Sequence, residues 1–119
     1  MVDKRGLQSE RYAVTAVEAT IGSVIPVNMR RYIYRVKVQD DSGAVNLVEL
    51  KSMLAGAAAV VVDQFRLVTP NETYVDPDEL KEDALPLYII PGSTAAAART
   101  MRAVGTGNAS LLLEYEDAE

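Results

Sequence analysis

The sequence predicts an all-β protein, an antiparallel and jelly-roll-like β-sandwich with one short helical turn near residues 77–83. First, residues 31–40 alternate strictly between two faces, which is the period of a half-buried strand. Second, the turn formers Asp-Asp-Ser-Gly at 40–43 separate this strand from another apolar run at 44–50, so the two predict a hairpin. Third, a proline stands one or two residues before Asn or Gly at 26–28, 70–71 and 91–92, which suits tight turns. Several short strands separated by such turns are typical of sandwiches and barrels.

The strand at 31–40 is expected to lie at the centre of the fold with one face buried. We expect Tyr34 and Val36 to be buried, and Arg35 and Lys37 to be substantially exposed. One face holds Tyr32, Tyr34, Val36 and Val38, and the expected outer face holds Arg31, Ile33, Arg35, Lys37 and Gln39.

Around this strand, the first half of the chain predicts a polar arm and further strands. Residues 1–10 are polar and predict a flexible arm, and residues 11–21 predict one strand that ends at Gly22-Ser23. The segment 51–59 is compatible with one helical turn and with a turn before the next strand. Residues 60–68 begin with three valines and predict a strand whose first half is covered on both faces.

A helical turn is predicted after the extended residues 74–75. Asp76 can cap a helix, Pro77 suits the first helical position, and Glu79 stands where the carboxylate of a capping box belongs. We therefore expect a turn or two of helix over 77–83, exposed because its side chains are nearly all charged. Residues 85–90 then predict a short strand, which ends in a turn at 91–93.

The alanine-rich segment 94–104 supports two predictions. Ser93 as cap, four alanines and Gly105 as terminator favour a helix, by about 1–2 kcal/mol for the alanines. The position between two strands favours a strand, and burial of one Met and one Val can offset the helical preference. We expect a strand here, then a turn at 105–108 and a closing strand at 109–115. The inner face of the closing strand is expected to hold Leu111, Leu113 and Tyr115.

The predicted division of the chain is a flexible N-terminal arm at 1–10, a single sandwich domain at 11–116 and an acidic tail at 117–119.

Composition excludes several classes of function. The chain has no cysteine and no histidine, which removes thiolate metal sites, thiol nucleophiles, Ser-His-Asp catalysis and imidazole ligands. A net charge of −5 disfavours binding to nucleic acid. No apolar run approaches the roughly 20 residues of a membrane span, and the first residues lack the apolar core of a signal peptide. We expect no catalytic residue, no cofactor, no bound metal, and neither a membrane nor nucleic acid as partner.

Three groups of residues have a functional and a structural interpretation. The carboxylates of 76–83 form a solvated cluster, with a calcium site as the alternative. The six tyrosines are expected in the core with their hydroxyls at its rim, and exposed aromatic platforms are the alternative. The basic residues Arg30, Arg31, Arg35 and Lys37 form a solvated outer stripe. The alternatives are a contact with phosphate or with an acidic patch of a neighbouring subunit, and the acidic tail favours the subunit contact.

The runs IPVNMRRYIYRVKV, FRLVTPNETYVDP, LPLYIIPGST and GTGNASLLLEYED resemble small β-sandwich structural proteins of virus and phage particles, of the capsid decoration or minor capsid type. The resemblance lies in the style of strands and turns, and the alanine-rich segment departs from it. It implies a non-enzymatic, self-associating protein of the virion that binds further copies of itself, for example as a trimer, and a capsid protein. The alternative is a ligand-binding sandwich for carbohydrate or protein, with Tyr74 and Tyr88 as the obvious exposed aromatics.

Self-association is expected to use two parts of the chain. The residues expected at a subunit contact are Arg31, Arg35, Lys37, Ala95, Ala96, Ala97 and Ala98. The alanines offer a flat surface with little side-chain entropy to lose when another backbone approaches.

Overall fold

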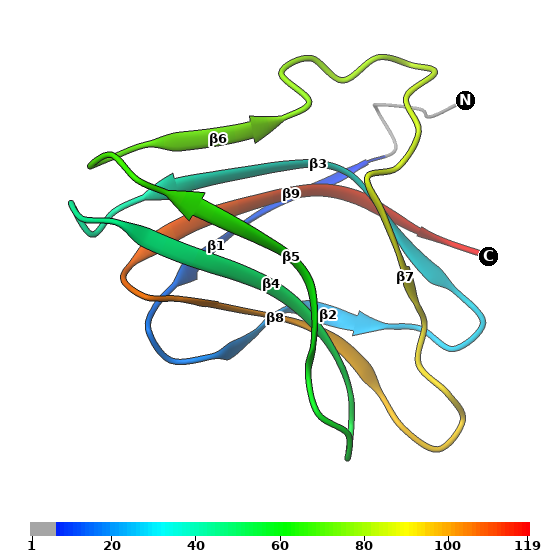
Figure 1. Cartoon of the computed structure of the whole chain (residues 1–119). Coiled ribbons are helices and arrows are strands. Elements are labelled where there is room, and N and C mark those ends of the chain that lie inside the picture. Colours follow the sequence, from blue (N-terminus) through cyan, green and yellow to red (C-terminus); the bar gives the residue numbers. More distant parts are fainter. Residues whose placement is uncertain (1–6) are drawn as a thin grey trace.

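The computed structural model describes residues 7–119 and is all-β, with two antiparallel sheets packed face to face (Figure 1). The prediction of a β-sandwich is therefore confirmed. The strands within the described residues are β1 (Gln8–Val14), β2 (Ala19–Ile25), β3 (Arg30–Asp40), β4 (Asn46–Leu54), β5 (Val60–Leu67), β6 (Thr73–Asp76), β7 (Tyr88–Pro91), β8 (Arg99–Gly105) and β9 (Ala109–Ala118).

Strands β1 and β9, the first and last of the described strands, are neighbours in the five-stranded sheet. The five-stranded sheet has the order β1-β9-β3-β6, with β7 also paired to β3, and the four-stranded sheet has the order β2-β8-β4-β5. Strand β6 pairs with residues 36–39 of β3 and β7 pairs with residues 30–33, so both lie along the same edge of β3. The pairs β1–β9, β2–β8, β3–β6 and β4–β5 thus nest inside one another along the sequence.

The core lies between the sheets and is formed by alternate residues of the central strands. Leu111, Leu113 and Tyr115 of β9 are buried, as the sequence predicts, and they belong to one buried cluster with Val48 and Leu50 of β4. Each fully buried side chain of this size stabilises the fold by roughly 1.5–3 kcal/mol. No helix between residues 7 and 119 is long and apolar enough to cross a membrane.

A β-bulge in β3 corrects the predicted alternation. Ile33 pairs with Tyr115 and Arg35 pairs with Glu114, so Tyr34 is an extra residue that has no partner across β9. Because the bulge reverses the alternation, Arg31 and Ile33 face the core together with Val36. The predictions that Tyr34 and Val36 are buried are confirmed. The prediction that Arg31 and Ile33 lie on the outer face is wrong, and Arg35 and Lys37 are half-buried rather than substantially exposed.

The predicted helical turn over 77–83 is absent from the structure, where bends and a turn replace it. Leu80, the apolar residue among the charged ones, packs on Tyr34 outside the main core. The carbonyl of Asp78 accepts a hydrogen bond of 3.1 Å from the guanidinium of Arg35, which takes the place of a helical N–H. These two contacts outweigh the capping pattern that the sequence presents.

Two other strand predictions need correction. Residues 11–21 do not form one strand, because the chain breaks at 15–18 and β1 and β2 belong to different sheets. The start of β5 is not covered on both faces: Val60 and Val61 are 63% and 42% exposed, since β5 is an edge strand.

The remaining boundaries are as follows. In the segment 51–59, β4 continues to Leu54 and a turn follows. The predicted break at Gly22-Ser23 lies within β2, at a register shift. The strand predicted at 85–90 begins only at Tyr88.

The two predicted ends of the domain also shift. Strand β1 begins at Gln8, so residues 8–10 belong to the sandwich, and residues 1–6 of the predicted arm lie outside the described residues. Strand β9 runs to Ala118, so the predicted acidic tail of 117–119 is mostly strand.

Candidate interaction surface

The residues predicted at a subunit contact are divided among three places. Arg35 and Lys37 lie on the outer face of the five-stranded sheet, and residues 95–98 lie in the loop between β7 and β8. The side chain of Arg31 is turned inward and is 1% exposed. The structure therefore does not join the basic stripe and the alanines in one surface, and Arg31 is enclosed within its own chain.

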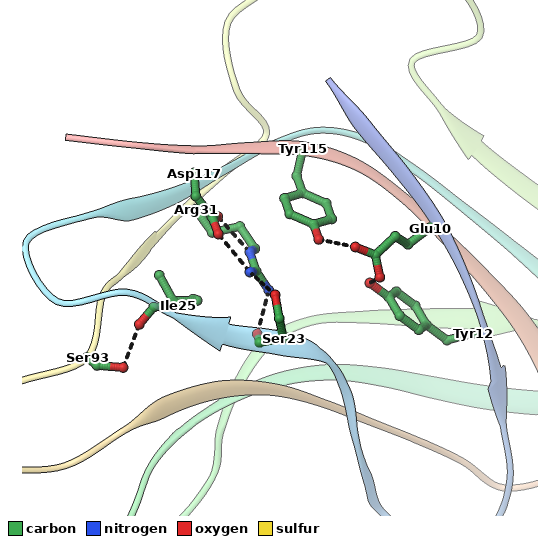
Figure 2. A network of polar contacts seen from close by, with 8 residues as sticks. All are labelled: Glu10, Tyr12, Ser23, Ile25, Arg31, Ser93, Tyr115 and Asp117. Carbon is green, nitrogen blue, oxygen red and sulfur yellow. Dashed lines mark hydrogen bonds and ion pairs between the residues drawn. The ribbon is translucent and has the colours of Figure 1, made fainter. Parts of the chain in front are cut away.

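Arg31 is held by a network that joins β2, β3 and β9 (Figure 2). Its guanidinium donates two hydrogen bonds to the carboxylate of Asp117, Nε to Oδ1 at 2.8 Å and Nη2 to Oδ2 at 2.9 Å. It also donates to the carbonyl and hydroxyl of Ser23 at 3.2 and 3.3 Å, and it lies 4.4 Å from the ring centroid of Tyr115. Burial alone would lower the pKa of Arg31, but the hydrogen bond and the charge of Asp117 raise it above its ordinary value. The sequence pattern does not reveal this pair, because it depends on the bulge that turns Arg31 inward.

Glu10 links β1 to β9 next to this network (Figure 2). The hydroxyl of Tyr12 donates to Glu10 Oε2 at 2.9 Å, and the hydroxyl of Tyr115 donates to Oε1. Burial and the hydrogen bond to Glu10 raise the pKa of Tyr115 to about 12, and burial also raises the pKa of Tyr12. Polar contacts therefore close this side of the sandwich, where β1 and β2 are the edge strands.

Asp40 organises the opposite end of β3. Its buried carboxylate accepts hydrogen bonds from the backbone and hydroxyl of Ser42, the backbone of Gly43, the amide of Asn46 and the backbone of Asn71. The hydrogen bonds from Ser42 are the largest cause that lowers the pKa of this carboxyl well below its usual range. The sequence predicts the turn at 40–43, and the structure adds that Asp40 also holds the β5–β6 turn.

The alanine-rich residues 94–98 are neither helix nor strand, while β8 confirms the predicted strand for residues 99–104. Ser93 Oγ donates to the carbonyl of Ile25 at 2.5 Å and accepts from the backbone of Arg99 at 2.8 Å (Figure 2 shows the first bond). Thr94 and Ala97 bond to each other through the Thr94 backbone and hydroxyl. These local bonds satisfy the backbone that a helix or a sheet would otherwise satisfy.

Three loops are fastened together at this end of the molecule. A methyl group on Gly92 would lie 2.1 Å from the carbonyl oxygen of Met29, so the β7–β8 loop lies directly against the β2–β3 loop. The backbone N–H of Ala55 in the β4–β5 loop donates to the carbonyl of Ala98 at 2.8 Å. The loops are therefore a fixed surface, and their alanines at 55, 57, 58, 95, 96 and 98 are exposed.

A groove of about 410 Å³ runs between the first two of these loops, and we call it the alanine groove. No charged side chain lines it. Its lining residues are Val24, Pro26, Val27, Ser93, Thr94, Ala95, Ala96, Ala97 and Ala98. The sequence predicts the alanine part of this surface but not Val24 and Val27, which come from an earlier loop and strand.

The basic stripe has a different environment. A nitrogen of Arg35 lies 3.7 Å from a carboxylate oxygen of Glu114, and Lys37 lines a small hollow with Arg11. The acidic residues predicted to complement the stripe in a neighbouring copy are engaged within this chain, because Asp117 binds Arg31 and Glu116 accepts a 3.3 Å hydrogen bond from Tyr34.

The two tyrosines that could form an exposed aromatic platform make contacts inside the molecule. The ring of Tyr74 lies 5.3 Å from the ring of Phe65, and the hydroxyl of Tyr88 donates to Asp63. Both contacts join the edge of one sheet to the edge of the other. Among residues 7–119, no group of three or more acidic side chains is placed to hold a metal ion.

Comparison with known proteins does not identify a family for this chain. No family model matches the chain, and no curated protein matches it. One solved structure, "Structure of infectious bursal disease virus Gx strain", is similar at 12% identity with a TM-score of 0.39. The match covers 90% of this chain and 32% of that chain, so the present chain spans about a third of it.

Proposed function

We propose that the protein is a non-enzymatic structural protein whose copies associate with one another, and that it is a component of a virus or phage particle, of the capsid decoration or minor capsid type. The observation that carries the proposal is the fixed end surface formed by the β2–β3, β4–β5 and β7–β8 loops, with its exposed alanines and the alanine groove. Exposed apolar side chains that gather on one surface are typical of interaction sites.

The nested strand pairs support the proposal that the protein is part of a virus or phage particle. The strand orders β1-β9-β3-β6 and β2-β8-β4-β5 support the proposal of a jelly-roll-like sandwich, and jelly rolls occur in viral capsid and lectin domains. The fold alone does not decide between such functions, so the proposal depends on the end surface. Its partners would be further copies of the chain and a capsid protein, and its location the virion.

The environment of the acidic groups supports a role without catalysis. The carboxylates of Glu10, Asp40 and Asp117 each accept hydrogen bonds that hold strands or turns together. A general acid or base must be free to meet a substrate, whereas these three groups are committed to the fold.

Sedimentation velocity over a concentration range from micromolar to millimolar tests the proposal. We expect species heavier than a monomer whose fraction rises with concentration, because the end surface would be buried between copies. A chain that remains monomeric at the highest concentration contradicts the proposal and makes a ligand-binding sandwich the better description.

A further inference from the structure

The most exposed large apolar side chain among the described residues is Leu85, at 84%. It lies in the segment between β6 and β7, after the exposed carboxylates of Glu82 and Asp83 and before Pro86. Residues 78–83, which precede it, contain four carboxylates and one lysine. Leu85 is therefore an apolar side chain presented beside a concentration of negative charge.

The alanine groove has the complementary properties. Its lining is apolar or uncharged, and it is open at the surface. The two segments that form it, 24–30 and 91–99, contain only two charged residues, and both are arginines, Arg30 and Arg99. Arg30 is exposed, and Arg99 directly follows the groove residue Ala98, with its Nε bonded to the carbonyl of Gly92 at 3.3 Å. An uncharged groove whose two segments carry only cationic side chains fits an apolar side chain that is flanked by carboxylates.

We infer that the groove binds the Leu85 segment of a second copy of this chain. In this contact Leu85 enters the alanine groove, and Glu82 and Asp83 pair with Arg30 and Arg99, which end the two segments that form the groove. The inference rests on the proposed function and specifies the contact through which copies would associate.

A chain cannot make this contact with itself. The segment of Leu85 precedes β7 and the groove loop follows it, so the length of β7 separates them at about 3.3 Å per residue. Figure 1 shows the two loops at opposite ends of β7. The high exposure of Leu85 agrees with this separation. Because donor and groove are different surfaces, the contact is heterologous, and repeated copies form a ring or a filament.

Complementation between two variants tests the inference. Leu85→Glu removes the apolar side chain but leaves the groove intact, and Ala96→Glu blocks the groove but leaves Leu85 intact. Each variant alone is expected to associate at least tenfold more weakly than the wild type in sedimentation velocity. An equimolar mixture is expected to form dimers, because one intact donor can still meet one intact groove. Val17→Glu and Ala44→Glu are the matched controls, since both positions are exposed and lie in other loops, and they should assemble as the wild type does.

The outcomes separate this inference from the proposed function. A wild type that associates while Leu85→Glu or Ala96→Glu keeps its full mass overturns the contact and leaves self-association standing. A mixture that stays monomeric also overturns the contact. A wild type that is monomeric at millimolar concentration overturns both.

A peptide experiment avoids dependence on the folding of the variants. A synthetic peptide with the sequence of residues 79–87 is added to ¹⁵N-labelled wild-type protein. We expect shifts in the amide signals of residues 93–98, smaller shifts with the Leu85→Ser peptide, and displacement of assembled copies. Shifts that are equal for both peptides, or absent from these residues, contradict the inference.

Discussion

Asp117→Ala is expected to lower the free energy of unfolding by about 3–5 kcal/mol, because it leaves the buried guanidinium of Arg31 without its counter-charge. The two bonds that are lost measure 2.8 and 2.9 Å. A hydrogen bond to a charged group contributes about 1.5–3 kcal/mol net, so two of them give about 3–6 kcal/mol, which overlaps this range. The bonds to Ser23 and the ring of Tyr115 remain, which places the expected loss near the lower end, at about 3 kcal/mol.

Urea unfolding at pH 7 measures this loss, with Glu119→Ala as the control. Glu119 is exposed and follows the end of β9, so its removal is expected to change the free energy of unfolding by less than about 0.5 kcal/mol. The double variant Arg31→Met/Asp117→Ala removes both charges and keeps much of the buried volume. It should be more stable than Asp117→Ala alone, with a coupling energy of at least about 2 kcal/mol.

Two results would refute this reasoning. One is a loss below about 1 kcal/mol for Asp117→Ala, and the other is simple addition of the effects of Arg31→Met and Asp117→Ala. Either would mean that Asp117 is a solvated residue of an acidic tail, as the composition of the last residues suggests.

Three other predictions concern the central strand, acid stability and metal. Val36→Ala should cost about 1–3 kcal/mol in urea melts because Val36 is fully buried, whereas Lys37→Ala should stay within about 0.5 kcal/mol; the reverse order would contradict the assigned faces. The pKa of Asp40 is lowered in the folded state, so its contribution is present above the unfolded value of about 3.9 and is lost as the pH falls below it. Asp40→Asn should therefore reduce stability at pH 7 and weaken the fall in stability between pH 5 and pH 2, and an unchanged pH profile would exclude this role. Thermal melts with excess calcium and with a chelator should coincide, and a rise of several degrees with calcium would identify the carboxylates of 76–83 as ligands.

The sequence predicts the fold class well because alternation and turn chemistry are local signals. The closing strand with Leu111 and Leu113 inward, and the turn that Asp40 begins, follow from residues within a few positions of one another. The bulge at Tyr34, in contrast, cannot be predicted from the residues next to it in the sequence. It is specified by the register against β9 and by the contact of Tyr34 with Leu80, and both involve residues far away in the sequence.

The candidate surface could be predicted only in part for the same reason. Four consecutive alanines are visible in the sequence, and their expected place at a surface agrees with their exposure. The groove also needs Val24 and Val27, which the pairing of β2 with β8 brings beside them. The helix signal at Asp76-Pro77 was misleading because the segment gains more from burying Leu80 and from bonding Arg35 than from a short, fully charged helix.

The position of β9 has a consequence for the order in which the protein can fold. It follows every other described strand in the sequence, yet it lies between β1 and β3 and is paired with both. The strand before it, β8, fills the same place between β2 and β4. A nascent chain that ends before β8 therefore lacks an inner strand of each sheet, and β1 and β2 have no paired strand at all. The sandwich can therefore form only after β8 and β9 have been synthesised, and because most pairings join distant parts of the chain its folding should be slow, as it is for other sandwiches of high contact order. Until then the valines and leucines of the unfinished sheets are open to contact with other chains, which favours aggregation.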